Sequence, residues 1–455
     1  MERSLFFGVA LLSVFLAACG GRKAGSPGPT SPEAPSEVFP EVTSSSKPQN
    51  LCYKNNPKAA RRDVVGVWIA SIDSYVLDSR DNISRSLDRL PKLGVNTVFP
   101  VVWNKGAIFF RDPMLVHEIG QSPHMPKAYK NRDVLAEVVA KAKNIKLDVL
   151  PWFEFGLKIT SDMPIFTQKP EWFLKNVKGE MTERFDNFSI AYLNPQNQEV
   201  RDFYKKLFVS GIRSPSVDGF QIDDHFGYPP EYGYDDLTVS IYKAEHKGME
   251  PPRDPKDPDW MRWRSDKLTE AWAEIVSFVR GYRPDIRISL APNLQRYAYE
   301  KSLQDWKTWM EKGLVDEIVL QNYKRGIPNF TQELEQDYVL EALKCVPFSV
   351  GILAGVETGV NAADVVAGQI RGAWRAGMEG VSFFHYPFLV GKRPPEVQKK
   401  FLELFPEIIH NRLPAPEGSE NQVGGDNQDG RVQEPGRKRM APESKPAAKA
   451  VQPKK

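Results

Sequence analysis

The chain has 455 residues, of which 41% are hydrophobic and 26% charged, and its formal net charge is +3. This near balance lacks the basic excess of nucleic-acid-binding proteins, so we expect no nucleic-acid partner. The length exceeds one average domain but suits a single eight-stranded α/β barrel with extensions at both ends.

The first residues are typical of an export signal. Arg3 precedes an apolar run from Leu5 to Leu16 that is too short to span a membrane, and Leu16-Ala17-Ala18-Cys19 follows. Small residues before a cysteine resemble a bacterial lipobox, in which that cysteine is lipidated and becomes the mature N-terminus. An ordinary signal peptide or an uncleaved anchor is the alternative. We expect residues 1–19 to be a lipoprotein signal, with lipidation, palmitate included, at Cys19.

The position of the protein in the cell follows from that signal. Gly20, rather than Asp, comes after Cys19. In a Gram-negative cell this favours a lipid anchor on the periplasmic side of the outer membrane. Export permits disulfides, and the two remaining cysteines, Cys52 and Cys345, could pair or stay as buried thiols.

Composition divides the rest of the chain into three parts. Residues 20–51 are rich in Gly, Ser, Pro and Thr and read as a disordered tether. Residues 52–412 carry the apolar patterns of a folded domain. Residues 413–455 return to a polar composition that ends in basic residues, and we expect a disordered tail.

Eight short apolar segments recur along the folded domain. Near-continuous rather than alternating apolar residues are typical of buried parallel strands. The segments are residues 64–70, 97–103, 147–154, 217–223, 287–293, 317–323, 348–354 and 380–386.

Helical spacing separates these segments. Apolar residues recur three and four positions apart at Ile83-Leu87-Leu90, Val134-Val138-Val139, Val200-Phe203-Tyr204-Leu207 and Trp272-Ile275-Val276-Val279. Strand and helix repeated eight times predict a (β/α)8 TIM barrel. The rival is an open doubly wound sheet, but its glycine-rich phosphate-binding motif is absent after the first strand. Long segments after the third and fourth strands predict long loops at the C-terminal face.

The fourth predicted strand ends in ionisable residues. The strand is apolar at Val217, Phe220 and Ile222, which predicts that it is buried. It is followed directly by Asp223-Asp224-His225. Active sites of TIM barrels lie at this C-terminal edge. One aspartate there could simply cap a helix, but two aspartates and a histidine favour a functional site. Asp218, earlier in the strand, is better explained as structural.

The ends of the other strands carry aromatic, amide and acidic side chains that a barrel brings to one face. Trp and Tyr stack on sugar rings, and Asn, Gln and His hold hydroxyl or N-acetyl groups. The residues expected to bind substrate are Trp68, Trp103, Asn104, Trp152, Asn194, His225, Tyr228, Asn293, Gln321, Tyr323, Glu357, His385 and Tyr386.

Two carboxyl groups would then perform glycoside hydrolysis, one as an acid and one as a nucleophile or base. We expect Asp223 to be the nucleophile or electrostatic stabiliser and Glu154 the general acid, with Asp224 as the competing candidate. Neighbouring strands allow either a retaining or an inverting separation. No cofactor is expected. Asp223, Asp224 and His225 are ligand types, but no zinc-protease motif exists, so we expect no metal.

Several motifs resemble the bacterial glycosyl hydrolase-like family 10 lipoproteins. They occur in order over residues 62–410: Val67-Trp68-Ile69-Ala70, Leu93 to Trp103, Pro151-Trp152-Phe153-Glu154, Leu193-Asn194-Pro195 with Val200-Arg201, Asp218 to His225, Leu320-Gln321-Asn322-Tyr323, and Phe383-Phe384-His385-Tyr386. The resemblance implies a TIM-barrel glycosidase of the cell envelope. Some members act on peptidoglycan strands, especially strands stripped of peptide.

The segment Asp218 to Asp223 is also similar to the fourth-strand signature of chitinase-like and amylase-like glycosidases. Asp223 occupies the place of its final aspartate, and His225 stands where chitinase-like enzymes carry their catalytic glutamate. This departure argues against simple chitinase chemistry. The leading hypothesis is an envelope-anchored hydrolase of peptide-free peptidoglycan strands. The alternatives are a non-catalytic glycan-binding lipoprotein and a glycosidase of another polysaccharide.

Overall fold

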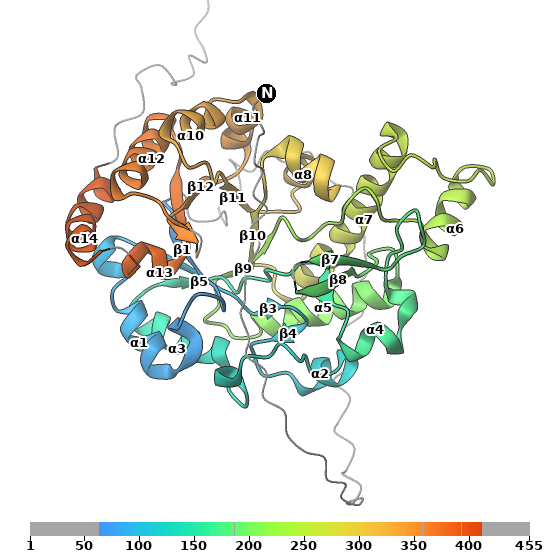
Figure 1. Ribbon diagram of the computed structural model, residues 1–455, viewed down its shortest axis with the longest axis horizontal. Coiled ribbons are helices and arrows are strands. Elements are labelled where there is room, and N and C mark those ends of the chain that lie inside the picture. Colours follow the sequence, from blue (N-terminus) through green and yellow to red (C-terminus); the bar gives the residue numbers. More distant parts are fainter. Residues whose placement is uncertain (1–62, 186, 357–358, 393, 412–455) are drawn as a thin grey trace, which may run out of the picture. The chain divides into compact units, whose positions relative to one another are not determined.

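The computed structural model describes residues 63–411, except residues 186, 357–358 and 393. Within this range an eight-stranded parallel sheet has the order β5-β2-β1-β15-β12-β11-β10-β9 (Figure 1). Its strands are β1 (Val65–Ile69), β2 (Thr97–Pro100), β5 (Asp148–Val149), β9 (Gly219–Asp223), β10 (Arg287–Ala291), β11 (Glu317–Gln321), β12 (Phe348–Leu353) and β15 (Gly380–Phe384). Each lies within one of the eight predicted segments, so the predicted TIM barrel is confirmed.

The barrel is closed between β5 and β9 by residues beyond the end of β5. Trp152 forms parallel bridges with Val101 on one side and Gln221 on the other. The Gln221 amide donates to the Pro151 carbonyl, and the Phe153 amide donates to the Gln221 carbonyl, both at 2.9 Å. Pro100 of β2 and Pro151 both lack an amide hydrogen, so β2 cannot donate to Leu150 and Pro151 cannot donate toward β9, and regular pairing on both sides of this segment is interrupted.

Most of the helices cover the outside of this sheet and alternate with its strands. The helices are α1 (Arg80–Leu87), α2 (Pro113–Ile119), α3 (Val134–Asn144), α4 (Pro164–Gln168), α5 (Gln198–Ile212), α6 (Asp236–Glu245), α7 (Pro258–Tyr282), α8 (Gln295–Ser302), α9 (Trp306–Glu311), α10 (Ile327–Leu334), α11 (Asp337–Cys345), α12 (Ala363–Arg375), α13 (Tyr386–Val390) and α14 (Pro395–His410). Of these, α4 and α6 lie in loops. The residues whose spacing predicted helices are buried against the sheet. This burial is the main source of helix stability in such a fold.

Long loops follow the third and fourth barrel strands, as predicted. The first carries α4 and an antiparallel sheet of β6 (Lys158–Thr160), β8 (Phe188–Tyr192) and β7 (Thr182–Phe185). The second carries α6. Two small hairpins, β3 (Trp103–Asn104) with β4 (Ala107–Ile108) and β13 (Gly355–Val356) with β14 (Gly359–Val360), complete the strands. All of these lie at or beyond the carboxyl ends of barrel strands.

Some predictions fall outside the described residues: the signal and Cys19, the tether, the tail, Cys52 and Glu357. Cys345, which ends α11, is disulfide-bonded. No helix within residues 63–411, as far as they are described, is both long and apolar enough to cross a membrane.

Candidate active site

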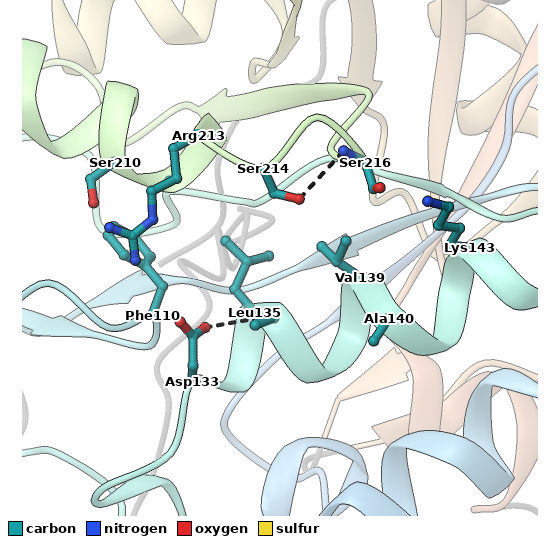
Figure 2. Close-up of a pocket in the computed structure, with 12 residues that line it drawn as sticks. Phe110, Asp133, Leu135, Val139, Ala140, Lys143, Ser210, Arg213, Ser214 and Ser216 are labelled. Atoms are coloured by element: carbon teal, nitrogen blue, oxygen red, sulfur yellow. Dashed lines mark hydrogen bonds between the residues drawn. The ribbon is translucent and has the colours of Figure 1, made fainter.

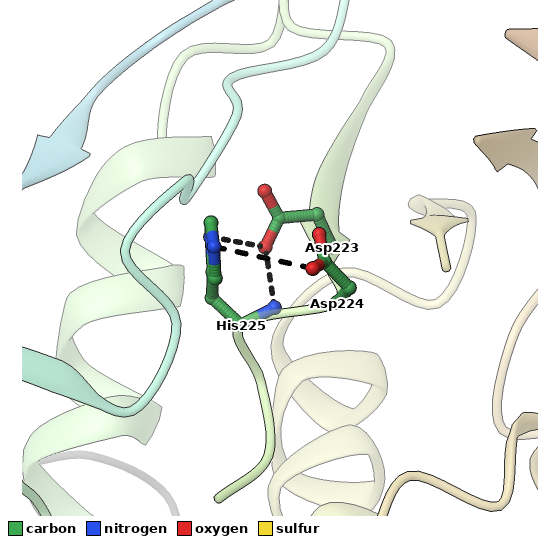
Figure 3. Close-up of side chains that lie close together, drawn as sticks. All are labelled: Asp223, Asp224 and His225. Carbon is green, nitrogen blue, oxygen red and sulfur yellow. Dashed lines mark hydrogen bonds and ion pairs between the residues drawn. The ribbon is translucent and has the colours of Figure 1, made fainter. Parts of the chain in front are cut away.

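Asp223, Asp224 and His225 come together at the carboxyl end of β9 (Figure 3). The five residues of β9 are buried, and its apolar side chains Phe220 and Ile222 fix the strand in the core. The chain leaves the sheet directly after Asp223. The predicted pair of aspartates and the histidine therefore share one site at the catalytic edge of the barrel.

Asp223 is the deepest of the three, with 1% of its surface exposed. Its Oδ2 accepts a 2.9 Å hydrogen bond from the Trp152 indole, and its Oδ1 accepts one of 2.9 Å from the His225 amide. Burial raises the pKa of Asp223, while the charge of His225 lowers it. Both oxygens are thus held by donors from the two strands that close the barrel.

Asp224 lies closer to solvent, with 18% of its side chain exposed. Asn293, just after β10, donates to its Oδ2 at 2.7 Å, and Gln321, at the end of β11, donates to its Oδ1 at 2.8 Å. The structure therefore brings these two predicted residues onto one carboxylate. Their amide donors fix its orientation.

His225 connects the aspartates to the third strand. Its Nδ1 donates a 2.6 Å hydrogen bond to the Glu154 carbonyl and lies 3.4 Å from Asp223 Oδ1. Burial and the charge of Lys158 lower its pKa, but Asp224 and Asp223 outweigh them and raise it to about 9. The imidazole is therefore a cation at neutral pH.

Glu154 is the second buried acid of the site, with 6% of its surface exposed. The Asn104 amide donates a hydrogen bond to its Oε2. Burial raises the pKa of Glu154 to about 7, and the charge of Asp223 adds to this rise, while the Asn104 hydrogen bond, His225 and Lys105 oppose it. A carboxyl group with this pKa is largely protonated in weakly acidic solution.

Gly156 allows this arrangement by turning the chain back against His225. Its φ is +50°, and a Cβ there would lie 2.1 Å from the His225 carbonyl carbon. The next amide, of Leu157, donates a 3.0 Å hydrogen bond to the His225 carbonyl. The backbone that follows Glu154 is thereby hydrogen-bonded to the His225 carbonyl, and only glycine fits at position 156.

Aromatic rings lie around the acids. Trp152 packs edge-to-face on Phe384 with ring centroids 6.3 Å apart, and Tyr323 lies 5.4 Å from the same ring. Phe384 and Tyr323 are partly exposed, whereas Trp152 is buried. Burial raises the pKa of Tyr323 well above its ordinary value, and the charges of Asp224, Asp223 and Glu154 add to the rise. Its phenol therefore stays neutral.

Six residues expected to bind substrate are instead buried, each with at most 2% of its surface exposed: Trp68, Trp103, Asn194, Tyr228, His385 and Tyr386. The Trp68 indole donates to Gln221 inside the barrel, and the Trp103 indole donates to the Gly156 carbonyl. Their contacts are those of supporting residues, because aromatic and amide side chains at strand ends can point inward as readily as outward.

Asn194 and Tyr386 have comparable supporting contacts, whereas the Tyr228 hydroxyl and His385 Nδ1 are buried without a hydrogen-bond partner among the described residues. The Asn194 amide donates to Asp235 at 2.8 Å, and the Tyr386 hydroxyl donates to the Ser86 carbonyl at 3.3 Å. Burial lowers the pKa of His385 to about 3, with a further contribution from Lys392. His385 is therefore neutral and sealed within the protein.

Several residues that contribute to the site lie outside the predicted set. Gln304, after α8, donates to the Asp223 and Phe226 carbonyls at 2.9 and 3.2 Å. Lys158 begins β6 and interacts electrostatically with Asp224, Asp223, Glu183 and Glu154. Lys158 follows Glu154 by four residues, but nothing in the sequence says that the loop folds back over the acids.

The ligand-type atoms of Asp223, Asp224 and His225 lie within 4.8 Å of one another, which is compatible with a metal site. The carboxylate oxygens already accept hydrogen bonds from Trp152, the His225 amide, Asn293 and Gln321. These donors belong to a hydrogen-bonded acid network, and they would compete with a cation.

A separate cavity of about 270 Å³ lies between α3 and the segment that follows α5. Figure 2 shows Leu135 and Val139 of α3 facing Ser214 and Ser216 across it. None of the predicted site residues lines this cavity.

Comparison with known proteins agrees with a site of two or more acids at the edge of the barrel, because the matches are glycosyl hydrolases. A family model described as Glycosyl hydrolase-like 10 matches residues 63–368. Glycosyl hydrolase DigH of Escherichia coli K12 is 21% identical over 304 residues, which are 57% of this chain and 65% of that protein. The same values hold for the protein of Shigella flexneri. The match thus spans slightly less than two thirds of the length of these relatives.

Solved structures share the fold at low sequence identity. The glycoside hydrolase domain of PgaB (BpsB) from Bordetella bronchiseptica has a TM-score of 0.56 and 12% identity, covering 74% of this chain and 97% of that one. The catalytic domain of a β-amylase from Paenibacillus polymyxa has a TM-score of 0.52 and 13% identity, covering 78% and 100%. At these identities the likeness concerns the barrel alone.

Proposed function

Because the chain belongs to the glycosyl hydrolase-like 10 family, we propose that it hydrolyses glycosidic bonds at the Glu154–Asp223–Asp224 site, and that its substrate is a peptidoglycan strand without stem peptides. The observation that carries the proposal is the buried Glu154 carboxyl group, whose pKa is raised to about 7, in the electrostatic field of Asp223. Two acids with different environments are what glycoside hydrolysis requires.

Glu154 is the general acid in this proposal. Burial keeps its proton at a pH where an ordinary carboxyl group has lost it, so it can protonate the oxygen of the leaving sugar. The Asn104 amide orients the group. The cationic His225, which donates to the Glu154 carbonyl and favours the ionised form of its carboxyl group, compensates the negative charge that remains after the proton is given.

Asp224 supplies the second carboxylate that faces the sugar. Its side chain is 18% exposed, whereas Asp223 beneath it is 1% exposed and holds hydrogen bonds at both oxygens. Asp223 is thus better suited to stabilise positive charge at the sugar and to orient His225 than to attack. Asn293 and Gln321 hold Asp224 in place.

The peptidoglycan substrate and the envelope location rest on the family resemblance and on the Leu16-Ala17-Ala18-Cys19 motif. Lipidation of Cys19 would keep the enzyme beside the cell wall. Labelled palmitate should be incorporated into the wild-type protein and not into Cys19→Ala. Equal labelling of both would contradict the anchor.

The hydrolysis is tested on purified peptide-free glycan strands, with products identified by mass spectrometry. Glu154→Gln and Asp224→Asn should each lower the rate by about 10²–10⁴-fold, the usual contribution of a positioned acid or base. Asp223→Asn should also lose most activity. Full activity of Asp223→Asn in a folded protein would overturn the proposal.

Asp218→Asn is the matched control, because Asp218 lies just before the opposite end of β9 and its carboxylate accepts a hydrogen bond from the Val149 amide. This variant should retain the wild-type rate. Binding of strands without release of new reducing ends would instead indicate a non-catalytic glycan-binding protein. Cleavage of another glycan in preference to peptidoglycan would retain the chemistry and replace the substrate.

A further inference from the structure

Lys158 is held next to the acids by the loop after the third barrel strand. Its amide donates a 2.8 Å hydrogen bond to the Phe155 carbonyl, and the preceding residue, Leu157, bonds to the His225 carbonyl. β6 therefore starts at the tip of β9, and the position of Lys158 is coupled to that of His225. The side chain is half-buried.

The charges around Lys158 are those of the proposed catalytic centre. Burial lowers the pKa of Lys158, while the charges of Asp224, Asp223, Glu183 and Glu154 oppose this and favour its ammonium form. Yet it makes no ion pair and donates no side-chain hydrogen bond to any residue that the structure describes. The Lys158 side-chain nitrogen has no hydrogen-bond partner among the described residues, yet it is not one of the fully buried atoms in that situation, so it is in contact with solvent.

Other shielded lysines of the barrel behave differently. Lys205 pairs with Asp202 and Glu274 at 2.8 and 2.7 Å. Lys267 pairs with Glu245 and Glu270 at 2.7 and 2.9 Å. Each of these two lysines therefore has a carboxylate in direct contact, which offsets the cost of removing its ammonium from water.

The four acids near Lys158 do not depend on it for hydrogen bonds. Asp223 accepts hydrogen bonds from Trp152 and from the His225 amide. Asp224 accepts them from Asn293 and Gln321, and Glu154 accepts one from Asn104. The Tyr192 hydroxyl donates to Glu183 at 3.0 Å. The three N–H donors of the ammonium therefore remain available for a ligand in a site rich in negative charge.

We propose that Lys158 binds a carboxylate on the sugar substrate and so selects an acidic sugar unit. This inference rests on the proposed function. A peptidoglycan strand without stem peptides exposes the lactyl carboxylate of each muramic acid unit, whereas an attached peptide converts that carboxylate into a neutral amide. Recognition by Lys158 would make the bare strand the preferred substrate.

Lys158→Gln tests this role, with Lys158→Arg as the charge-conserving variant. Lys141→Gln is the matched control, since Lys141 is also shielded but lies on α3 and pairs with Asp88 at 2.6 Å. Each protein is assayed as the full chain on two substrates. One is the peptide-free strand, and the other is the same strand with its carboxylates converted to methylamides.

Lys158→Gln should raise KM for the carboxylate strand by about 10- to 100-fold, the usual effect of losing a hydrogen bond to a charged group. On the methylamide strand its KM should equal that of the wild type, and kcat should change little on either. Lys158→Arg should recover much of the lost affinity. Lys141→Gln should match the wild type throughout.

An equal loss on both substrates, or a fall in kcat with an altered pH profile, would overturn the inference, because Lys158 would then act only through the charges of the acids. The proposed function would survive that result, since the wild type would still cleave both strands. Cleavage of neither strand by the wild type would overturn both. Far-ultraviolet circular dichroism establishes that each variant is folded.

Discussion

The indole N–H of Trp152 donates a 2.9 Å hydrogen bond to the Asp223 carboxylate, and the backbone of Trp152 pairs with Gln221, two residues before that aspartate. One residue of the third strand segment thus closes the barrel and holds the buried acid of the fourth. The third and fourth strand tips, where Glu154 and Asp223 lie, are therefore fixed relative to each other.

Trp152→Phe keeps an aromatic ring but removes the donor to Asp223. The buried oxygen would lose its partner, which costs about 1–3 kcal/mol of stability. We expect a lower melting temperature and a 10- to 100-fold lower kcat on glycan strands. Trp374→Phe serves as a control, because the Trp374 indole donates to the Ile408 carbonyl, away from the acids. A fully active Trp152→Phe enzyme would show that Asp223 does not need this donor.

Activity should fall as the pH rises through about 7. The folded pKa of Glu154 is raised to about 7, and the general acid works only when protonated, so kcat/KM should drop about tenfold per pH unit above that value. Glu154→Gln should remove this limb along with most of the activity. The test is to measure kcat/KM of the wild type and of Glu154→Gln from pH 4 to 10. An unchanged alkaline limb in the residual activity of Glu154→Gln would assign the limb to another group.

The same raised pKa has a consequence for folding. Because Glu154 ionises more readily in the unfolded chain, its contribution to stability is greatest below its unfolded pKa and declines as the pH rises through about 7. Glu154→Gln should therefore gain in melting temperature relative to the wild type as the pH increases from 5 to 9. A constant difference between the two proteins would contradict the raised pKa.

Asn104→Ala should move the alkaline limb to higher pH. The Asn104 amide favours the ionised form of Glu154, so its removal raises the pKa of the acid further. The variant should lose activity at its optimum, because Glu154 is less well oriented, yet keep a larger fraction of that activity at alkaline pH. A limb that moves to lower pH would indicate that the hydrogen bond favours the protonated acid.

Gly156→Ala should disrupt the site. The new Cβ would lie 2.1 Å from the His225 carbonyl carbon, so the backbone must move, at a cost of about 1–3 kcal/mol beyond the strain of a positive φ. Gly179→Ala isolates that strain, because Gly179 has a φ of +82° and no atom within 4 Å of the added Cβ. Chemical denaturation of both variants gives the difference. Equal stabilities would mean that the clash is relieved without cost.

The barrel was predictable because each of its strands is an apolar run buried on both sides, and the acids after β9 follow from the rule that chemistry collects at strand tips. The direction in which each side chain at a strand end points, and the partner it contacts, was not predictable. Trp68, Trp103 and Trp152 all lie at strand ends and are all buried, yet their indoles donate to three different partners, and of these three indoles that of Trp152 donates to an acid of the site. Asp224 and Asp223 are adjacent, but only the folded chain shows which is exposed.

Lys158 was missed for a related reason. Its place beside the acids depends on the turn at Gly156 and on an antiparallel sheet inside a loop, both of which involve residues far apart in sequence. Glycine at position 156 permits a turn, but the partner of that turn, His225, lies sixty-nine residues later. Such pairings cannot be read from local patterns.

The seam between β5 and β9 is the thinnest part of the barrel, because the two regularly paired residues of β5 pair with β2, and the bridge to β9 is formed by Trp152 with Gln221. Heat or denaturant should open this seam before the other strand pairs separate. Since both proposed acids are attached to its two edges, enzymatic activity would decay ahead of the circular dichroism signal. Loss of glycan cleavage would then report local unfolding between β5 and β9 before the rest of the barrel unfolds.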